Sequence, residues 1–96
     1  MKLRFSRLAL SDLGAIGEWI AKDNPQRAAE YVLEIEADCR RLIDFPFTGE
    51  KLGRYQKEQI RRKLHGEYLM LYVVREDAIY VVRVIHGAQD YLRFLD

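Results

Sequence analysis

The sequence predicts an α+β fold in a single domain, residues 1–96, in which one strand is followed by two helices and then by three strands. Three observations predict it. Apolar residues alternate with polar ones at the N-terminus, recur every three or four positions up to residue 44, and form near-continuous runs after residue 60. With 96 residues, of which 49% are hydrophobic and 32% charged, the chain can build one core.

The first elements are a strand and a helix. Residues 2–6, KLRFS, alternate in the period-two pattern of a half-buried strand. Ser6 can then cap a helix that ends at Lys22 or Asp23, because its hydroxyl accepts a hydrogen bond from an unpaired backbone N–H. The apolar face predicted for this helix consists of Leu10, Leu13, Ile16, Gly17 and Ile20.

A second helix is expected from Pro25 to about Asp44. Asn24 serves as its cap and Pro25 as its first residue, where the missing N–H costs nothing. Pro46 ends the segment because it restricts the residue before it and lacks a donor. The predicted buried stripe is Ala28, Val32, Ile35, Cys39, Leu42 and Ile43.

Three strands complete the fold. IRRKL at 60–64 predicts a short strand, YLMLYVV at 68–74 a strong one, and IYVVRVIH at 79–86 a third, with REDA at 75–78 as a turn. The last two form a hairpin. Their apolar character places them centrally in the sheet, covered on at least one face by the helix pair.

Charge is concentrated in one segment although the whole chain carries only +1. Residues 51–66 hold six lysines and arginines against one glutamate, a net charge of +5. Such a patch attracts acidic partners or phosphates, whereas the near-neutral total argues against non-specific binding of nucleic acid. The alternative is a solvated edge strand, since edge strands often carry cations that discourage pairing.

Several classes of protein are excluded. The chain has one cysteine, which predicts a reducing compartment and hence a cytoplasmic protein, and it shows neither a signal peptide nor a membrane span. It lacks a glycine-rich phosphate loop and the CxxC and HExxH motifs. With two histidines, neither a metal site nor a cofactor is expected.

The candidate site residues lie in the last strands. Strict alternation places Arg83 and His86 on opposite faces unless a bulge intervenes, and it separates Val82 and Val84 from Val81. Arg83 amid valines indicates an ion pair with a carboxylate on a neighbouring element. Arg61 can bind a carboxylate or phosphate through two hydrogen bonds, or it is a surface cation.

The strand end offers a further candidate. Gly87 after His86 permits a sharp turn or close approach of another chain, so His-Gly marks an opening toward a partner or a hydrogen-bonded turn.

The chain resembles the ParE branch of the RelE/ParE toxins. The stretch SRLALSDLGAIGEWIAKDNPQRAAEYVLEI, residues 6–35, is similar to its helical hairpin, followed in order by FPFTG, Arg61 before Gly66, YLMLYVV and VVRVIHGAQD. The matching hairpin residues are Ala9, Asp12, Leu13, Ile20, Ala21, Asp23, Asn24, Pro25, Ala28 and Ala29. The resemblance covers nearly the whole chain and rests on the order of these pieces.

This resemblance implies a β-α-α-β-β-β fold with a helical hairpin packed on a mainly antiparallel sheet. It implies a toxin of a bacterial type II toxin–antitoxin system that binds and inhibits DNA gyrase and forms a hetero-oligomer with a cognate antitoxin. The antitoxin would cover the basic patch and exposed sheet with an acidic or amphipathic segment. The residues expected to face the target or partner are Arg61, Arg62, Arg83, His86, Gly87, Asp90 and Tyr91.

Two alternatives stay open. A RelE-like ribosome-dependent mRNA endonuclease would use Arg61, Arg83, His86 and Tyr91 as catalytic residues. The H-G-x-x-D pattern after the last strand favours the gyrase-binding branch, although Gln89 stands where an arginine is common. A third possibility is a non-toxic member that binds antitoxin and aids repression of its own operon.

Overall fold

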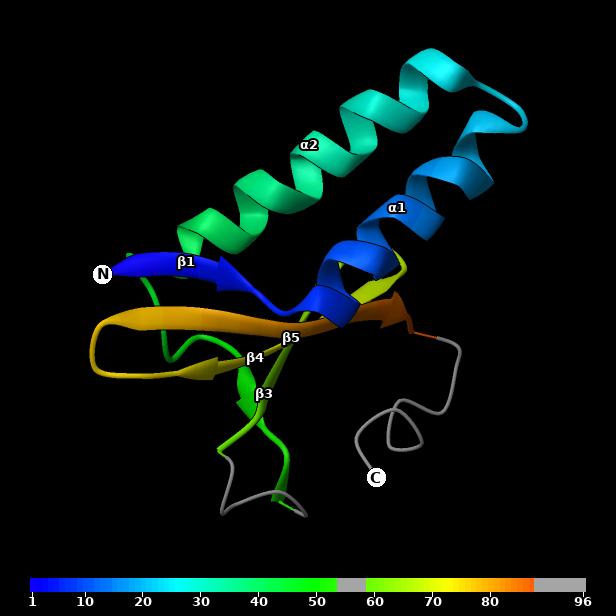
Figure 1. Cartoon of the computed structure of the whole chain (residues 1–96). Coiled ribbons are helices and arrows are strands. Elements are labelled where there is room, and N and C mark those ends of the chain that lie inside the picture. Colours follow the sequence, from blue (N-terminus) through cyan, green and yellow to red (C-terminus); the bar gives the residue numbers. More distant parts are fainter. Residues whose placement is uncertain (54–58, 88–96) are drawn as a thin grey trace.

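The computed structural model describes residues 1–53 and 59–87 and confirms the α+β fold (Figure 1). The elements are β1 (Lys2–Phe5), α1 (Arg7–Ala21), α2 (Pro25–Arg41), β2 (Glu50–Lys51), β3 (Arg61–His65), β4 (Tyr68–Val74) and β5 (Ala78–His86). Strand β2 was not predicted, because two exposed residues carry no periodic pattern. No helix in the described part of the chain is long and apolar enough to cross a membrane.

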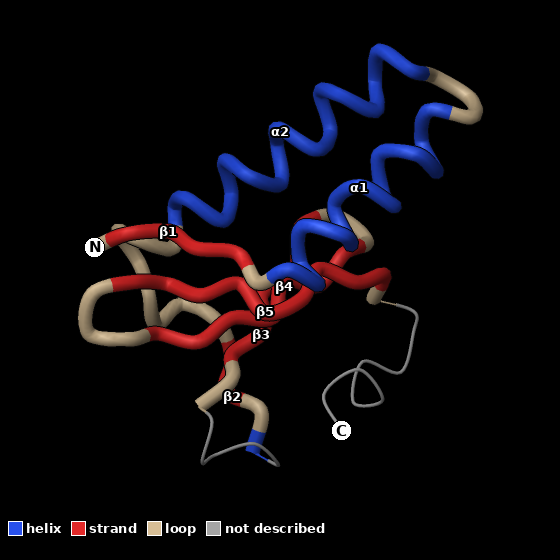
Figure 2. The backbone as a smooth tube through the Cα atoms, viewed as in Figure 1, coloured by secondary structure: helices blue, strands red, loops and turns tan. Residues whose placement is uncertain are grey.

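The five strands form one mixed sheet in the order β1-β5-β4-β3-β2. β1 runs parallel to β5, and the other neighbouring strands are antiparallel, so the sheet is mainly antiparallel as expected. The two helices form an antiparallel hairpin on one side of this sheet, with the tip of the hairpin extending beyond it (Figures 1 and 2).

Both predicted helix caps are present. The Ser6 hydroxyl accepts from the Ala9 N–H at 2.9 Å and donates to the Val82 carbonyl at 2.6 Å, so the cap also fastens α1 to β5. Asn24 Oδ1 accepts from the Arg27 N–H at 3.0 Å. Helix α2 ends at Arg41, before the expected Asp44, because residues 42–44 continue as turns.

The core has two parts, one on each face of the sheet. The cluster between helices and sheet contains Ala9, Leu13, Ile16, Ile35, Cys39, Leu42, Met70, Tyr72, Ile79, Val81 and Val84. The second cluster, on the other face, contains Leu52, Ile60, Leu69, Leu71, Val73 and Ile85. The expectation that Leu10 is buried was wrong: it is 56% exposed, since α1 turns Ala9, Leu13 and Ile16 toward the sheet.

A β-bulge interrupts the pairing of the two central strands. Leu71 pairs with Arg83 while Tyr72 pairs with Val81, so Val82 is an extra residue in β5. The predicted alternation was therefore wrong across the bulge, where it had placed Val82 with Val84 and apart from Val81. Val81 and Val84 both join the helix-side cluster, and Val82 packs against the other one.

Candidate functional site

Arg83 and Asp12 form a two-bond ion pair between β5 and α1. Arg83 Nε donates to Asp12 Oδ2 at 2.7 Å and a terminal guanidinium nitrogen donates to Oδ1 at 2.8 Å. The Val84 N–H donates to the same carboxylate at 3.0 Å. Both side chains are 14% exposed, and the hydrogen bond to Asp12 raises the pKa of Arg83. The ion pair expected for Arg83 is confirmed.

His86 is the last residue of β5, and Gly87 follows it beside the turn that joins β3 and β4. His86 Nε2 lies 3.4 Å from Glu67 Oε2, and its ring meets the Tyr68 ring edge-on at 5.4 Å between centroids. The Gly87 N–H donates to the Glu67 carbonyl at 2.6 Å. A Cβ at residue 87 would lie 3.1 Å from that carbonyl, so glycine keeps the contact close.

Arg83 and His86 line one pocket of about 380 Å³ between α1 and the end of β5, here called the β5-end pocket. Its lining is Asp12, Ala15, Ile16, Trp19, Tyr68, Arg83, Val84, Ile85 and His86. The pairing of β5 with β4 stays regular from Arg83 to His86, so the predicted alternation holds between these two residues. Both nevertheless line the pocket, because β1 pairs with β5 only as far as Val81 and the rest of β5 is an open edge beside α1.

Trp19 forms an exposed aromatic wall of the pocket. This residue, the sole tryptophan of the chain, is 66% exposed, and Lys22 Nζ lies 5.1 Å from its ring centroid. Sequence reasoning did not assign Trp19 or Tyr68 to a site with Arg83. The sequence does not indicate this grouping, because the pocket residues are far apart along the chain. They come from α1, from the first residue of β4 and from the last residues of β5.

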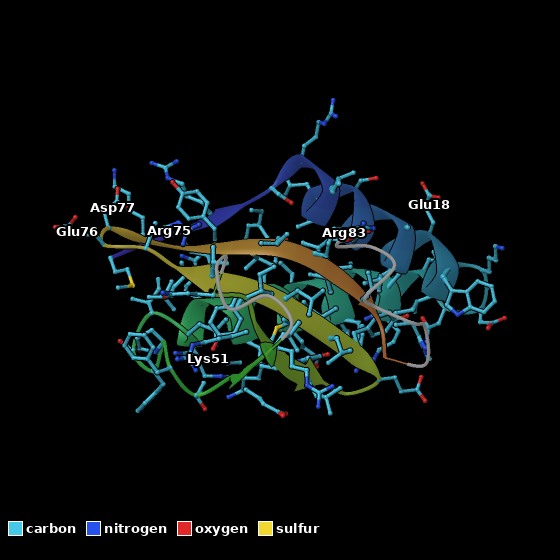
Figure 3. All side chains as sticks on the ribbon, turned by 90° about the horizontal axis from the view of Figure 1, so that it is seen from below. Glu18, Lys51, Arg75, Glu76, Asp77 and Arg83 are labelled. Atoms are coloured by element: carbon cyan, nitrogen blue, oxygen red, sulfur yellow. The ribbon has the colours of Figure 1, made fainter. Side chains whose placement is uncertain are left out.

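Arg61 and Arg62 lie elsewhere, at the β2 side of the sheet. A terminal nitrogen of Arg61 donates to the Gly49 carbonyl at 2.7 Å and to the Phe47 carbonyl at 3.3 Å. Arg62 pairs with Glu50 at 3.0 Å. β4 separates these residues from Arg83, and Figure 3 shows Lys51 of β2 far from Arg83 across the sheet. The predicted basic patch is thus partly engaged in intramolecular contacts.

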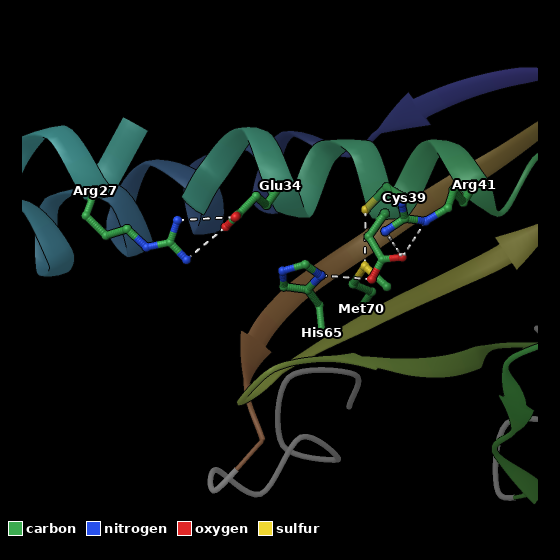
Figure 4. A network of polar contacts seen from close by, with 7 residues as sticks. Arg27, Glu34, Cys39, Arg41, His65 and Met70 are labelled. Carbon is green, nitrogen blue, oxygen red and sulfur yellow. Dashed lines mark hydrogen bonds and ion pairs between the residues drawn. The ribbon is translucent and has the colours of Figure 1, made fainter. Parts of the chain in front are cut away.

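A polar network that the sequence did not predict joins α2 to the end of β3 (Figure 4). His65 Nδ1 lies 2.8 Å from Asp38 Oδ2, and Arg41 donates to Asp38 Oδ1 at 3.1 Å. Burial favours a raised pKa for Asp38, but hydrogen bonds from His65 and Arg41 outweigh it and lower that pKa. The Tyr31 ring packs edge-on against His65 at 5.5 Å. This arrangement fixes α2 on the sheet.

Cys39 is a core residue and not a nucleophile. Its Sγ lies 3.4 Å from Met70 Sδ in the fully buried helix-side cluster (Figure 4). Burial raises the pKa of the thiol to about 12, so the reactive thiolate is not populated near neutral pH. The remaining predicted site residues, Asp90 and Tyr91, lie outside the described residues, as do residues 54–58 of the basic patch.

Fold and site together define a small α+β protein in which Arg61 and Arg83 are held by intramolecular contacts at two separate places. The chain matches the family model described as ParE toxin of type II toxin-antitoxin system, parDE, over residues 3–91. It therefore belongs to the ParE toxin family, which confirms the resemblance noted in the sequence.

A solved structure supports the same fold. The chain is similar to a chain of the chromosomal ParDE TA system from P. aeruginosa, with a TM-score of 0.74 and 20% sequence identity. The match covers 90% of this chain and 95% of that one. No curated protein matches the sequence. Membership of the family implies an antitoxin partner.

Proposed function

We propose that the protein inhibits DNA gyrase by binding it, in the cytoplasm, and that a cognate antitoxin neutralises it. The observation that carries the proposal is the separation of Arg61 from Arg83. Arg61 donates to carbonyls beside β2, whereas Arg83 is paired with Asp12 of α1 across the sheet.

An mRNA endonuclease needs a different arrangement. Cleavage by the 2′-hydroxyl requires a base, an acid and cations around one phosphate, within hydrogen-bonding reach of the reacting atoms. The backbones of β3 and β5 lie about 10 Å apart because β4 stands between them. Their two guanidinium groups are fixed by partners on opposite sides of β4, so they do not form one phosphate site.

The β5-end pocket is suited to a contact with a large protein. It combines an exposed tryptophan with Tyr68, His86 and an arginine already oriented by Asp12. Tryptophan, tyrosine and arginine are the residues that most often dominate the binding energy of protein interfaces. We place the gyrase contact at this pocket and at the residues that follow Gly87.

Two assays on the purified protein test the proposal. In the first, gyrase supercoils relaxed plasmid in the presence of the protein, and we expect inhibition that Trp19→Ala weakens and Arg61→Ala leaves unchanged. In the second, translating ribosomes are incubated with the protein, and we expect intact mRNA.

The opposite results decide between the other functions. Codon-phased mRNA cleavage that depends on Arg61 and Arg83 would establish the endonuclease and refute the proposal. Antitoxin binding without gyrase inhibition or cleavage would identify a non-toxic member of the family.

A further inference from the structure

The last residues of β5 form an open edge of the sheet. β1 pairs with β5 only as far as Val81, because the chain leaves β1 at Ser6 and enters α1. The Ser6 hydroxyl still donates to the Val82 carbonyl, but in the described part of the chain no strand other than β4 pairs with residues 83–86. α1 lies beside this edge (Figure 1), and the β5-end pocket lies between the two.

The backbone of Val84 points toward this edge. Its N–H donates to Asp12 Oδ2 of α1 at 3.0 Å. In an antiparallel strand the N–H and C=O of one residue point to the same side, and the side reverses at the next residue. The Val84 carbonyl therefore also faces the edge, whereas Gly87, three residues on, donates to the Glu67 carbonyl on the β4 side. No described group donates to the Val84 carbonyl, so this acceptor is left for a bound chain.

The wall that α1 presents to the edge is small and apolar beyond Asp12. It consists of Ala15, Ile16 and Trp19, which recur at helical steps and face the pocket. A helix is about 10 Å wide with its side chains and bonds its N–H groups internally, so it offers the strand edge no donor. An extended chain lies about 4.8 Å from its neighbour and directs alternate N–H groups at it. The pocket therefore suits an extended chain better than a helix.

We infer that the β5-end pocket binds an extended segment of gyrase, which adds to the open edge of β5 as a further strand and donates a backbone N–H to the Val84 carbonyl. The inference rests on the proposed function, which places the gyrase contact at this pocket, and it specifies the form in which gyrase is recognised. Strand addition obtains affinity from main-chain hydrogen bonds and specificity from pockets for alternate side chains.

The two sides of the pocket also specify the side chains of the bound segment. Val84 pairs with Met70, and both belong to the cluster on the helix side of the sheet. A residue of the added strand next to Val84 points to the same side, toward Ala15 and Trp19 of α1. We therefore expect an apolar residue there, followed by a residue that points to the opposite face.

Filling the pocket from α1 tests the location. Ala15 is exposed and lines the pocket, so the ring of Ala15→Phe should occupy the space beside the edge of β5. We expect the concentration that inhibits gyrase supercoiling to rise by about tenfold or more. Gly14→Phe is the matched control, because it adds the same side chain at the adjacent residue, outside the pocket, where a Cβ meets nothing within 4 Å. It should change inhibition by less than about twofold. Urea denaturation checks that both variants are folded.

Peptides test the extended backbone independently of these variants. Overlapping peptides that tile the gyrase subunits are titrated against the fluorescence of Trp19, the sole tryptophan of the chain, which lines the pocket. The peptide that binds is then resynthesised with an N-methyl group at each amide in turn. Methylation removes the donor, so we expect a loss of about tenfold or more where the N–H faces Val84 and little loss at the next amide, which points away from β5.

The outcomes separate the inference from the proposed function. If wild-type protein does not inhibit gyrase, the proposed function is wrong and the inference falls with it. If wild type and Ala15→Phe inhibit gyrase equally, or every N-methyl peptide binds as well as its parent, strand addition alone is wrong. Absence of any binding peptide would also overturn it, since the pocket would then recognise a folded surface of gyrase. A dimer of the free protein that Ala15→Phe dissociates would replace the gyrase segment by the β5 edge of a second copy.

Discussion

The two flanks of α1 differ in how completely they are used by the fold. On the flank toward β5, Asp12 accepts three hydrogen bonds and Ile16 is buried. On the other flank, Leu10 is exposed and Glu18 has no ion pair among the described residues. The difference indicates that paired polar groups hold α1 on the sheet, while the unused flank is available to a partner.

The largest expected effect comes from removing the Asp12–Arg83 ion pair on the flank of α1 toward β5. Asp12→Ala removes the carboxylate that accepts two hydrogen bonds from the mostly buried Arg83 guanidinium and one from the Val84 N–H, and we expect a loss of about 3 kcal/mol in the free energy of unfolding. Urea denaturation measures it. Glu18→Ala on the other flank should change stability by less than about 0.5 kcal/mol. Equal effects of the two substitutions would refute the distinction between the flanks.

A second substitution tests a buried hydroxyl on the helix-side face of the sheet. Tyr72 is fully buried, accepts from the Gly49 N–H at 2.8 Å and donates to the Pro46 carbonyl at 2.9 Å. Tyr72→Phe leaves the buried N–H unpaired and should cost about 2 kcal/mol in urea denaturation. Tyr80→Phe is the control because Tyr80 is 37% exposed, and a loss as large as that of Tyr72→Phe would contradict this account.

A smaller effect concerns the dependence of stability on pH. The folded-state pKa of Asp38 lies below its unfolded value, so its contribution is present above the unfolded pKa and is lost as the pH falls through the folded pKa. His65→Phe keeps a ring beside Tyr31 but removes the hydrogen bond. The folded-state pKa of Asp38 should then lie closer to its unfolded value, so urea midpoints measured across the acid range should show a smaller loss of stability than in wild type. Superimposable pH profiles would show that His65 does not lower the pKa of Asp38.

The smallest expected effect is a gain on the unused flank. Gly14→Ala should stabilise the protein by about 0.5–1 kcal/mol, because alanine is the better helix former and its Cβ meets nothing within 4 Å. Gly17→Ala is the matched comparison, since its Cβ would lie 3.4 Å from Val32 Cγ2 and should gain less. Thermal melts measure both, and a destabilising Gly14→Ala would show that the space beside residue 14 is filled in the free protein.

Local chemistry explains what the sequence could predict. Ser6 and Asn24 cap their helices through partners three residues away, and the period-two and period-four patterns mark strands and helices directly. The order of elements follows from these signals. The bulge at Val82 could not be predicted in this way, because one extra residue in an apolar run does not change the composition of the strand.

Contacts between distant residues decide the site. Asp12 and Arg83 are 71 positions apart, and His65 and Asp38 are 27 apart, so each pair meets only after the helices pack on the sheet. The sequence could indicate that Arg83 needs a carboxylate, but 15 aspartates and glutamates were available. The exposure of Leu10 likewise depends on how α1 is rotated about its axis on the sheet. The spacing of apolar residues does not determine that rotation.

A gyrase supercoiling assay tests most directly whether the flank of α1 toward β5, with Trp19, contacts gyrase. Wild-type protein, Trp19→Ala and Arg61→Ala are compared at equal concentration. We expect wild type and Arg61→Ala to inhibit supercoiling to the same extent, and Trp19→Ala to inhibit it less, because Trp19 lines the β5-end pocket while Arg61 lies at the β2 side of the sheet. Equal inhibition by Trp19→Ala, or loss of inhibition by Arg61→Ala, would contradict this placement of the contact.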